Sequence, residues 1–289
     1  MNVILHYVDV SNLIDGNTLT VLDLFFFLQR KIKIKSVFFI GDPNLNFLLD
    51  LLKSRYNNKL LSTRHLYWIN TTINTSCSKL MKHFTYKYNN VICTDATYNV
   101  LTKSSFKLVT NRFLILNSWF SFYKKNNYQD NCIIFNENTL CGEVNYRKKI
   151  YFDVIKNNNT INDNKTMFIL ANGERRLTQE ELDEIKDKYN SYNLILCQDR
   201  IENLNISGYT LYKVGQPLFS YSDYLYVPTK TYEFAPRMLV ESKYLNKNIH
   251  YYKYPENFSQ RFQDVLDNNI NKYKLDETDE IVQYILGGK

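Results

Sequence analysis

Asp95 is the leading candidate among several acidic residues that could act as a catalytic base; Asp9, Asp15 and Asp42 are other candidates, each near a strand end or turn. The short run 91–93, Val-Ile-Cys, is typical of a buried strand and leads directly into Thr94 and Asp95. Aspartate is depleted in strands, so we expect Asp95 at the end of this strand, where the backbone holds a side chain rigidly. A carboxylate there can take a proton from an attacking hydroxyl that comes within hydrogen-bond reach. The alternative is that Asp95 only forms a turn.

Two arginines follow another strand, in the stretch 166–181, TMFILANGERRLTQEE. Gly173 lets a ligand approach the backbone, and a helix that begins with a capping-box pattern at 178–181 offers free N–H groups to an anion. Arg175 and Arg176 add forked donors that suit phosphate oxygens. The stretch therefore predicts a phosphate site, although it is neither a Walker A motif nor a dinucleotide fingerprint. A plain strand-to-helix turn with solvated arginines is the alternative.

A third group of charged residues lies at the start of a later helix. Pro236 is well suited to a first helical turn, Glu233 lies just before it, and Arg237 and Glu241 are four apart on one helix face. If Arg237 faces the same cleft as Arg175 and Arg176, it completes a diphosphate clamp. A carboxylate at that place accepts hydrogen bonds from ribose or sugar hydroxyls. The alternative is an ordinary ion pair along the helix.

Strand-like and helix-like segments alternate along the chain, which predicts an α/β fold with a mostly parallel sheet. The expected strands are 3–10, 36–40, 65–69, 91–93, 112–116, 166–170, 193–197, 209–214, 224–227 and 249–252. The expected helices are 18–31, 45–57, 77–88, one that begins at 178, 236–245, 258–271 and 277–286.

The polar, unpatterned stretch 156–165 divides the chain into two halves. We therefore expect two Rossmann-like domains that face a central cleft, an N-terminal one over 1–160 and a C-terminal one over 161–289. The last helix is expected to pack back on the N-terminal domain. Open α/β sheets bind ligands at the carboxyl ends of their strands, so such a cleft would collect Asp95 on one side and the arginines on the other.

Composition limits the classes of partner. The chain of 289 residues carries a formal net charge of +7, which suits nucleic acid or a phosphorylated small molecule, with a solvated lysine-rich surface as the alternative. None of its five cysteines forms a C-x-x-C pair, so we expect free thiols and neither a zinc site nor a disulfide frame. The sequence shows no signal-peptide pattern and no apolar run long enough to span a bilayer, which indicates the cytoplasm.

The stretch 66–100 resembles part of the T-even phage DNA β-glucosyltransferase family. It has a hydrophobic strand, the step Asn-Thr-Thr-Ile-Asn at 70–74, a helix, and a strand that ends in Thr94-Asp95. In that family the aspartate is the proposed catalytic base, so the resemblance implies this role for Asp95. It also implies the two-domain glycosyltransferase B architecture.

The second half resembles the same family in separate pieces. Residues 172–176 match a glycine step followed by a diphosphate-binding arginine, for which Arg176 aligns best and Arg175 is the one-residue alternative. The step 214–217, with Gly215 and Pro217, resembles the segment whose backbone touches the uracil. Arg237 and Glu241 resemble the arginine and glutamate that hold the nucleotide-sugar, but the family spaces them three apart and this chain four apart.

The resemblance implies a glycosyltransferase that moves a sugar from a UDP-sugar, expected to be UDP-glucose, to a hydroxyl acceptor with inversion. The expected acceptor is the hydroxymethyl group of a 5-hydroxymethylated pyrimidine in double-stranded DNA. A divalent cation, Mg or Mn, near the diphosphate is left open, with no metal-ligating residues predicted. The expected protein is a monomeric phage protein in the host cytoplasm, without a membrane partner. The alternatives are a glycosyltransferase with a glycan or lipid acceptor and a non-catalytic DNA-binding protein of the same fold.

A basic and aromatic stretch in the first half is the candidate DNA-binding surface. Its residues are Lys103, Lys107, Arg112, Trp119, Lys124 and Lys125. A core strand flanked by solvated lysines is the alternative interpretation.

Overall fold

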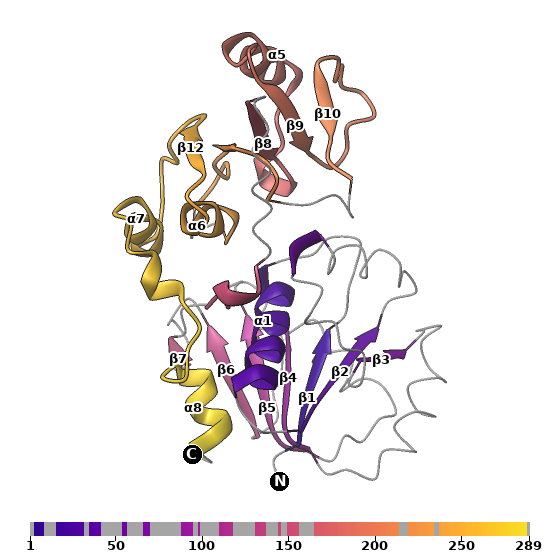
Figure 1. The fold of residues 1–289 in the computed structure, drawn as a ribbon, viewed down its shortest axis with the longest axis vertical. Coiled ribbons are helices and arrows are strands. Elements are labelled where there is room, and N and C mark those ends of the chain that lie inside the picture. Colours follow the sequence, from indigo (N-terminus) through magenta and orange to yellow (C-terminus); the bar gives the residue numbers. More distant parts are fainter. Residues whose placement is uncertain are drawn as a thin grey trace. The chain divides into compact units, whose positions relative to one another are not determined.

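The computed structural model describes most of the second half of the chain and separate segments of the first half. The described ranges are 3–8, 16–31, 35–41, 54–56, 66–69, 88–94, 98, 110–117, 131–136, 144–145, 149–155, 165–213, 219–233 and 237–287. The chain divides into two compact units (Figure 1). The first unit contains Met1–Leu48, Asn58–Val154 and Tyr273–Lys289, and the second contains Leu49–Asn57 and Ile155–Lys272.

The first unit is built on a seven-stranded sheet with the order β3-β2-β1-β4-β5-β6-β7. Every neighbouring pair is parallel. The strands are β1 (Val3–Val8), β2 (Lys35–Gly41), β3 (Leu66–Ile69), β4 (Tyr88–Thr94), β5 (Thr110–Asn117), β6 (Cys132–Asn136) and β7 (Val144–Asn145). The strand order reverses between β1 and β4, so the carboxyl ends of these two strands form the topological switch point of the sheet.

Helix α1 (Gly16–Lys31) packs on this sheet, against β1, β2 and β4 (Figure 1). Its segment 21–28 is buried throughout, and the buried Asp23 accepts a 3.0 Å hydrogen bond through Oδ2 from the backbone N–H of Tyr151. On the strand side, β4 is buried along almost its whole length. A helix that packs on a buried parallel strand is the usual arrangement in α/β proteins, where helices cover the faces of the sheet.

Helix α8 (Glu280–Gly287) also belongs to the first unit. The Tyr284 ring packs edge-on against Phe135 of β6, with ring centroids 5.6 Å apart. Its backbone carbonyl accepts a 2.8 Å hydrogen bond from Arg112 Nη2 of β5. Helix α8 thus contacts strands β5 and β6 of the first sheet.

The second unit has a five-stranded sheet with the order β10-β9-β8-β11-β12, again with every neighbouring pair parallel. The strands are β8 (Thr166–Leu170), β9 (Asn193–Cys197), β10 (Tyr209–Leu211), β11 (Asp223–Tyr226) and β12 (Asn248–Tyr251). The order reverses between β8 and β11, which places the switch point of this sheet at their carboxyl ends.

Helices α5 (Gln179–Lys188), α6 (Arg237–Tyr244) and α7 (Gln260–Leu266) complete the second unit. The second unit also contains the short 3₁₀ turn η5 (Gly173–Arg175), whereas η4 (Phe152–Val154) lies in the first unit and η6 (Ile270–Tyr273) crosses the boundary between the two. The expected capping box at the start of α5 is confirmed, because the Thr178 and Glu181 side chains each bond the backbone of the other residue. The helix then buries Leu182 and Ile185 in a core with residues of β8 and β9.

Both sheets are parallel, and described helices connect some of their strands, which confirms the expected α/β class and is compatible with a Rossmann-like fold. Among the described residues, no helix is both long and apolar enough to cross a membrane.

The buried His6 of β1 makes the stability of the first unit dependent on pH. Its side chain is fully buried, and desolvation lowers the pKa of His6 from 6.5 to about 3. The native state therefore holds His6 neutral, while the unfolded chain takes up a proton below about pH 6.5. We expect the free energy of unfolding to fall by up to about 1.4 kcal/mol per pH unit as the pH drops from about 6 to about 4.

Urea unfolding of the wild type and of His6→Leu, followed across this pH range, measures the effect. His6→Leu is expected to lose this component of the slope, and Ile4→Leu on the same strand is expected to keep it. An unchanged pH slope in His6→Leu contradicts the assignment to His6.

Candidate functional site

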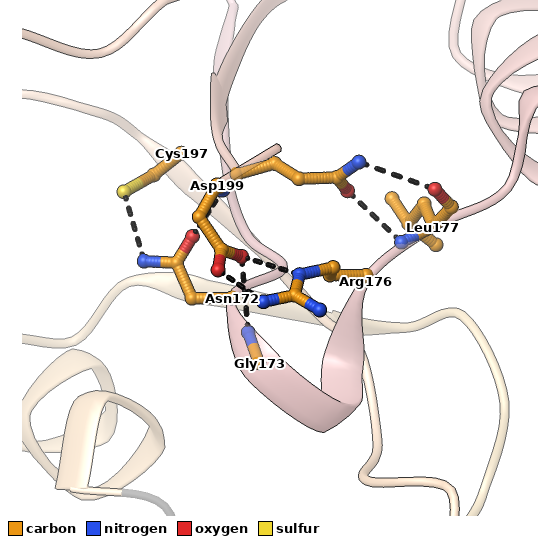
Figure 2. Close-up of polar contacts among 7 residues, drawn as sticks. Asn172, Gly173, Arg176, Leu177, Cys197 and Asp199 are labelled. Atoms are coloured by element: carbon orange, nitrogen blue, oxygen red, sulfur yellow. Dashed lines mark hydrogen bonds and ion pairs between the residues drawn. The ribbon is translucent and has the colours of Figure 1, made fainter. Parts of the chain in front are cut away.

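The turn after β8 is shaped by a glycine and fastened to the end of β9. Gly173 has φ +63, in the left-handed region that favours glycine, and no atom within 4 Å would meet an added Cβ, so the backbone conformation is the constraint. Asn172 accepts a 2.9 Å hydrogen bond from the Asp199 backbone N–H and donates to Cys197 Sγ at 3.7 Å. The carboxyl ends of two neighbouring strands are thereby joined (Figure 2).

Arg176 forms a two-point ion pair with Asp199, as Figure 2 shows. Arg176 Nε donates to Asp199 Oδ1 at 2.8 Å, and Nη2 donates to Oδ2. The Gly173 backbone N–H also donates to Oδ1, at 3.1 Å. The hydrogen bond from Arg176, helped by that of Gly173, lowers the pKa of Asp199 to about 2. Asp199 is charged at neutral pH and fixes the direction of the Arg176 guanidinium.

Arg175 points to a different carboxylate. Its Nη2 donates to both oxygens of Glu233, at 2.7 and 2.8 Å. Glu233 is only 2% exposed and also accepts from the Tyr226 hydroxyl at 2.6 Å and from the Thr229 backbone N–H at 3.2 Å. Burial opposes the charge on Arg175, but Glu233 outweighs it and raises the pKa of the guanidinium. Glu233 thus holds Arg175, and its oxygens are already engaged by protein donors.

Arg175 and Arg176 line a pocket of about 200 Å³ at the carboxyl edge of the second sheet. The rest of its wall comes from 227–230 after β11, 252–256 after β12, Leu177 and Glu181. The pocket therefore lies beside the switch point between β8 and β11, where open α/β sheets bind ligands. Of the predicted nucleotide-sugar residues, the structure brings these two arginines to the pocket and puts Glu233 in contact with Arg175.

Arg237 and Glu241 do not line this pocket and form the ion pair that was the alternative interpretation. Arg237 Nε donates to Glu241 Oε1 at 2.8 Å. Glu241 is fully buried and also accepts from Arg55 Nη2. Arg55 is itself buried and lies 5.6 Å from the Phe219 ring centroid. A buried carboxylate between two guanidinium groups is a compensated charge in the core of the second unit.

Two of these partners, Asp199 and Arg55, were not predicted. Asp199 could have been found by asking which acidic residues follow each expected strand, since it comes two residues after β9. Arg55 carries no such signal, because 186 residues separate it from Glu241.

Several predicted site residues lie outside the described part of the chain. They are Asp95, Gly215, Pro217, Lys103, Lys107, Trp119, Lys124 and Lys125. Asp95 is the next residue in the sequence after β4, one of the two strands at the switch point of the first sheet. The roles proposed for these residues stay predictions.

Arg112, from the predicted DNA-binding stretch, is described and has protein partners. Its Nε donates to Asn90 Oδ1 of β4 at 3.1 Å, and its Nη2 donates to the Tyr284 carbonyl. These contacts tie β5 to β4 and to α8 within the first unit.

Three cysteines lie in the described part of the chain. Cys93, Cys132 and Cys197 are free thiols, and burial raises the pKa of Cys197. In the ranges that the structure covers, no group of three or more His, Cys, Asp or Glu side chains is placed to hold a metal ion.

Comparison with protein-family models gives no match for this chain, and comparison with curated proteins gives none either. The fold, the pocket and the ion pairs around it are therefore the features that indicate a function.

The role of Glu233 can be tested through stability. Glu233→Gln leaves the partly buried Arg175 without its counter-charge, and we expect the free energy of unfolding to fall by about 2 kcal/mol or more. Glu174→Gln is the matched control, because Glu174 is exposed and lies beside Arg175 in the turn η5. Its free energy of unfolding is expected to change by no more than about 0.5 kcal/mol. Denaturant unfolding measures both variants, and equal effects contradict the assignment of Glu233 as the holder of Arg175.

Proposed function

We propose that this protein is a nucleotide-sugar-dependent glycosyltransferase of the glycosyltransferase B class, with UDP-glucose as its donor. The observation that carries the proposal is the arginine-lined pocket at the carboxyl edge of β8, β11 and β12. Its place at a switch point and its two arginines suit a nucleoside diphosphate.

The two arginines would stabilise the departing diphosphate. Within the described residues, Arg175 contacts Glu233 through Nη2 alone, so its Nε and Nη1 hydrogens remain for phosphate oxygens. Arg176 contacts Asp199 through Nε and one hydrogen of Nη2, which leaves the Nη1 hydrogens and the second Nη2 hydrogen. Donors that are already oriented need little reorganisation when negative charge develops on the leaving group. Both arginines therefore keep donors that can bind diphosphate oxygens.

Asp95 would act as the general base. Its carboxylate takes the proton of the acceptor hydroxyl while the hydroxyl oxygen attacks the anomeric carbon of the sugar. The bond from that carbon to the diphosphate oxygen breaks, UDP leaves, and the configuration at the carbon inverts. The resemblance of 66–100 and the position of Asp95 directly after β4 support this role.

The proposed acceptor is the hydroxymethyl group of a 5-hydroxymethylated pyrimidine in double-stranded DNA. The resemblance and the net charge of +7 support it. Such a base has to be reached in the groove or flipped out of the stack before its hydroxyl can attack.

A UDP-release assay with UDP-glucose tests the proposed function. We expect release to depend on duplex DNA that contains 5-hydroxymethylcytosine, with unmodified duplex and soluble glycans giving only background. Release that depends on a glycan instead would replace the acceptor, and the absence of any UDP release or UDP-glucose binding would remove the enzyme assignment. Adding EDTA or Mg²⁺ in parallel shows whether a divalent cation takes part.

Asp95→Ala tests the base. General-base catalysis contributes ~100- to 10,000-fold, so turnover is expected to fall by that order while UDP affinity stays at the wild-type value. Asp42→Ala is a matched control, since Asp42 also follows a strand of the first sheet, directly after Gly41 of β2. Near-normal turnover in Asp95→Ala is the result that excludes Asp95 as the base.

A further inference from the structure

The loop after β12 presents a flat aromatic surface in the pocket. Tyr254 is 64% exposed, yet one face of its ring stacks on Tyr251, with ring centroids 4.9 Å apart and an angle of 9°. Stacking on one side fixes the plane of the Tyr254 ring, and the large exposed fraction shows that much of the ring stays open to solvent. A rigid tyrosine with an open face is suited to stack a planar ligand ring.

A series of side-chain contacts connects Tyr254 to Arg175. Tyr251 packs against Tyr226, its register partner on β11, with centroids 5.6 Å apart and an angle of 65°. The Tyr226 hydroxyl donates to Glu233, which in turn holds Arg175. The spacing between the Tyr254 ring and the Arg175 guanidinium is therefore set by packed groups before any ligand binds, which reduces the ordering cost of binding.

The rest of the pocket wall combines flat groups with two lysines, Lys230 and Lys253, and two glutamates, Glu181 and Glu256. Lys253 Nζ lies 4.6 Å from the Tyr252 ring centroid, and Lys230 and Pro255 also line the pocket. Its volume of about 200 Å³ lies below the ~300–1,000 Å³ typical of sites for drug-sized ligands. The flat groups suit a ligand with a single flat ring system, and the arginine side of the pocket suits an anionic group on it.

We propose that this pocket takes the base of the nucleotide, stacked on Tyr254, with the phosphates at Arg175. The inference rests on the proposed function for the presence of a nucleotide and adds where its base lies. The family resemblance places the base beside Gly215, which follows β10 at the opposite end of the second sheet from β12. The stacked tyrosines place it instead on the β11–β12 side of β8.

Isothermal titration of the full-length protein with UDP and with pyrophosphate tests this placement, because only UDP carries a base. Base–aromatic stacking gives an expected loss of roughly 5- to 100-fold in UDP affinity for Tyr254→Ala. Pyrophosphate affinity is expected to stay at the wild-type value. Tyr254→Phe keeps the ring and is expected to bind UDP within about twofold of the wild type.

Tyr244→Ala is the matched control. Tyr244 is another exposed tyrosine, at 39%, but it lies at the end of α6 and does not line the pocket. Wild-type UDP affinity in Tyr254→Ala overturns the base placement and leaves the proposed function standing. An equal loss for UDP and pyrophosphate overturns it as well, because the ring would then act only by positioning Arg175. A wild-type protein that binds neither UDP nor UDP-glucose overturns the proposed function together with this inference.

Discussion

The buried carboxylate of Glu233 is the constraint on which the candidate site depends. A carboxylate with 2% exposure has lost most of its hydration and needs donors around it. Those donors come from Arg175 in the turn after β8, from Tyr226 of β11 and from the Thr229 backbone in the next loop. Glu233 therefore holds together chain segments from both sides of the switch point. The guanidinium of Arg175 keeps a fixed place there because leaving would strand a buried charge.

Two consecutive arginines secure the central strand β8 to both of its neighbours. Arg175 reaches Glu233 on the β11 side, while Arg176 reaches Asp199 after β9. Gly173, with its left-handed backbone, directs its N–H to the same Asp199 carboxylate. The result is a turn whose backbone and guanidinium groups are oriented without a ligand. Fixed, oriented cationic donors at the carboxyl edge of a parallel sheet are what a leaving diphosphate requires.

Local pattern predicted much of the framework. The alternation of strand-like and helix-like segments gave the α/β class, and the residues Thr178 to Glu181 gave the capping box. Strand β6, Cys132–Asn136, was missed although its Ile-Ile-Phe run is strand-like. The helix expected over 258–271 ends earlier, since α7 ends at Leu266 and Asn268 adopts φ 63, which does not continue a right-handed helix.

The partners of the charged residues were much less predictable. From the sequence, Arg175 and Arg176 were placed after a strand and Glu233 just before a later helix, where a carboxylate was expected to accept hydrogen bonds from ribose or sugar hydroxyls. Its pairing with Arg175 joins residues 58 apart in the sequence, and the contact of Arg55 with Glu241 spans 186. Such pairs are set by sheet order and by the need to compensate buried charge. Neither can be read from spacing along one strand or helix.

Amide hydrogen exchange of the full-length protein, with and without saturating UDP-glucose, tests most directly whether the switch point of the second sheet binds the nucleotide. The account predicts ligand-dependent protection of the backbone in 173–177, 227–230 and 252–256, the three loops that line the pocket. Clear binding of UDP-glucose without protection of these loops would contradict it.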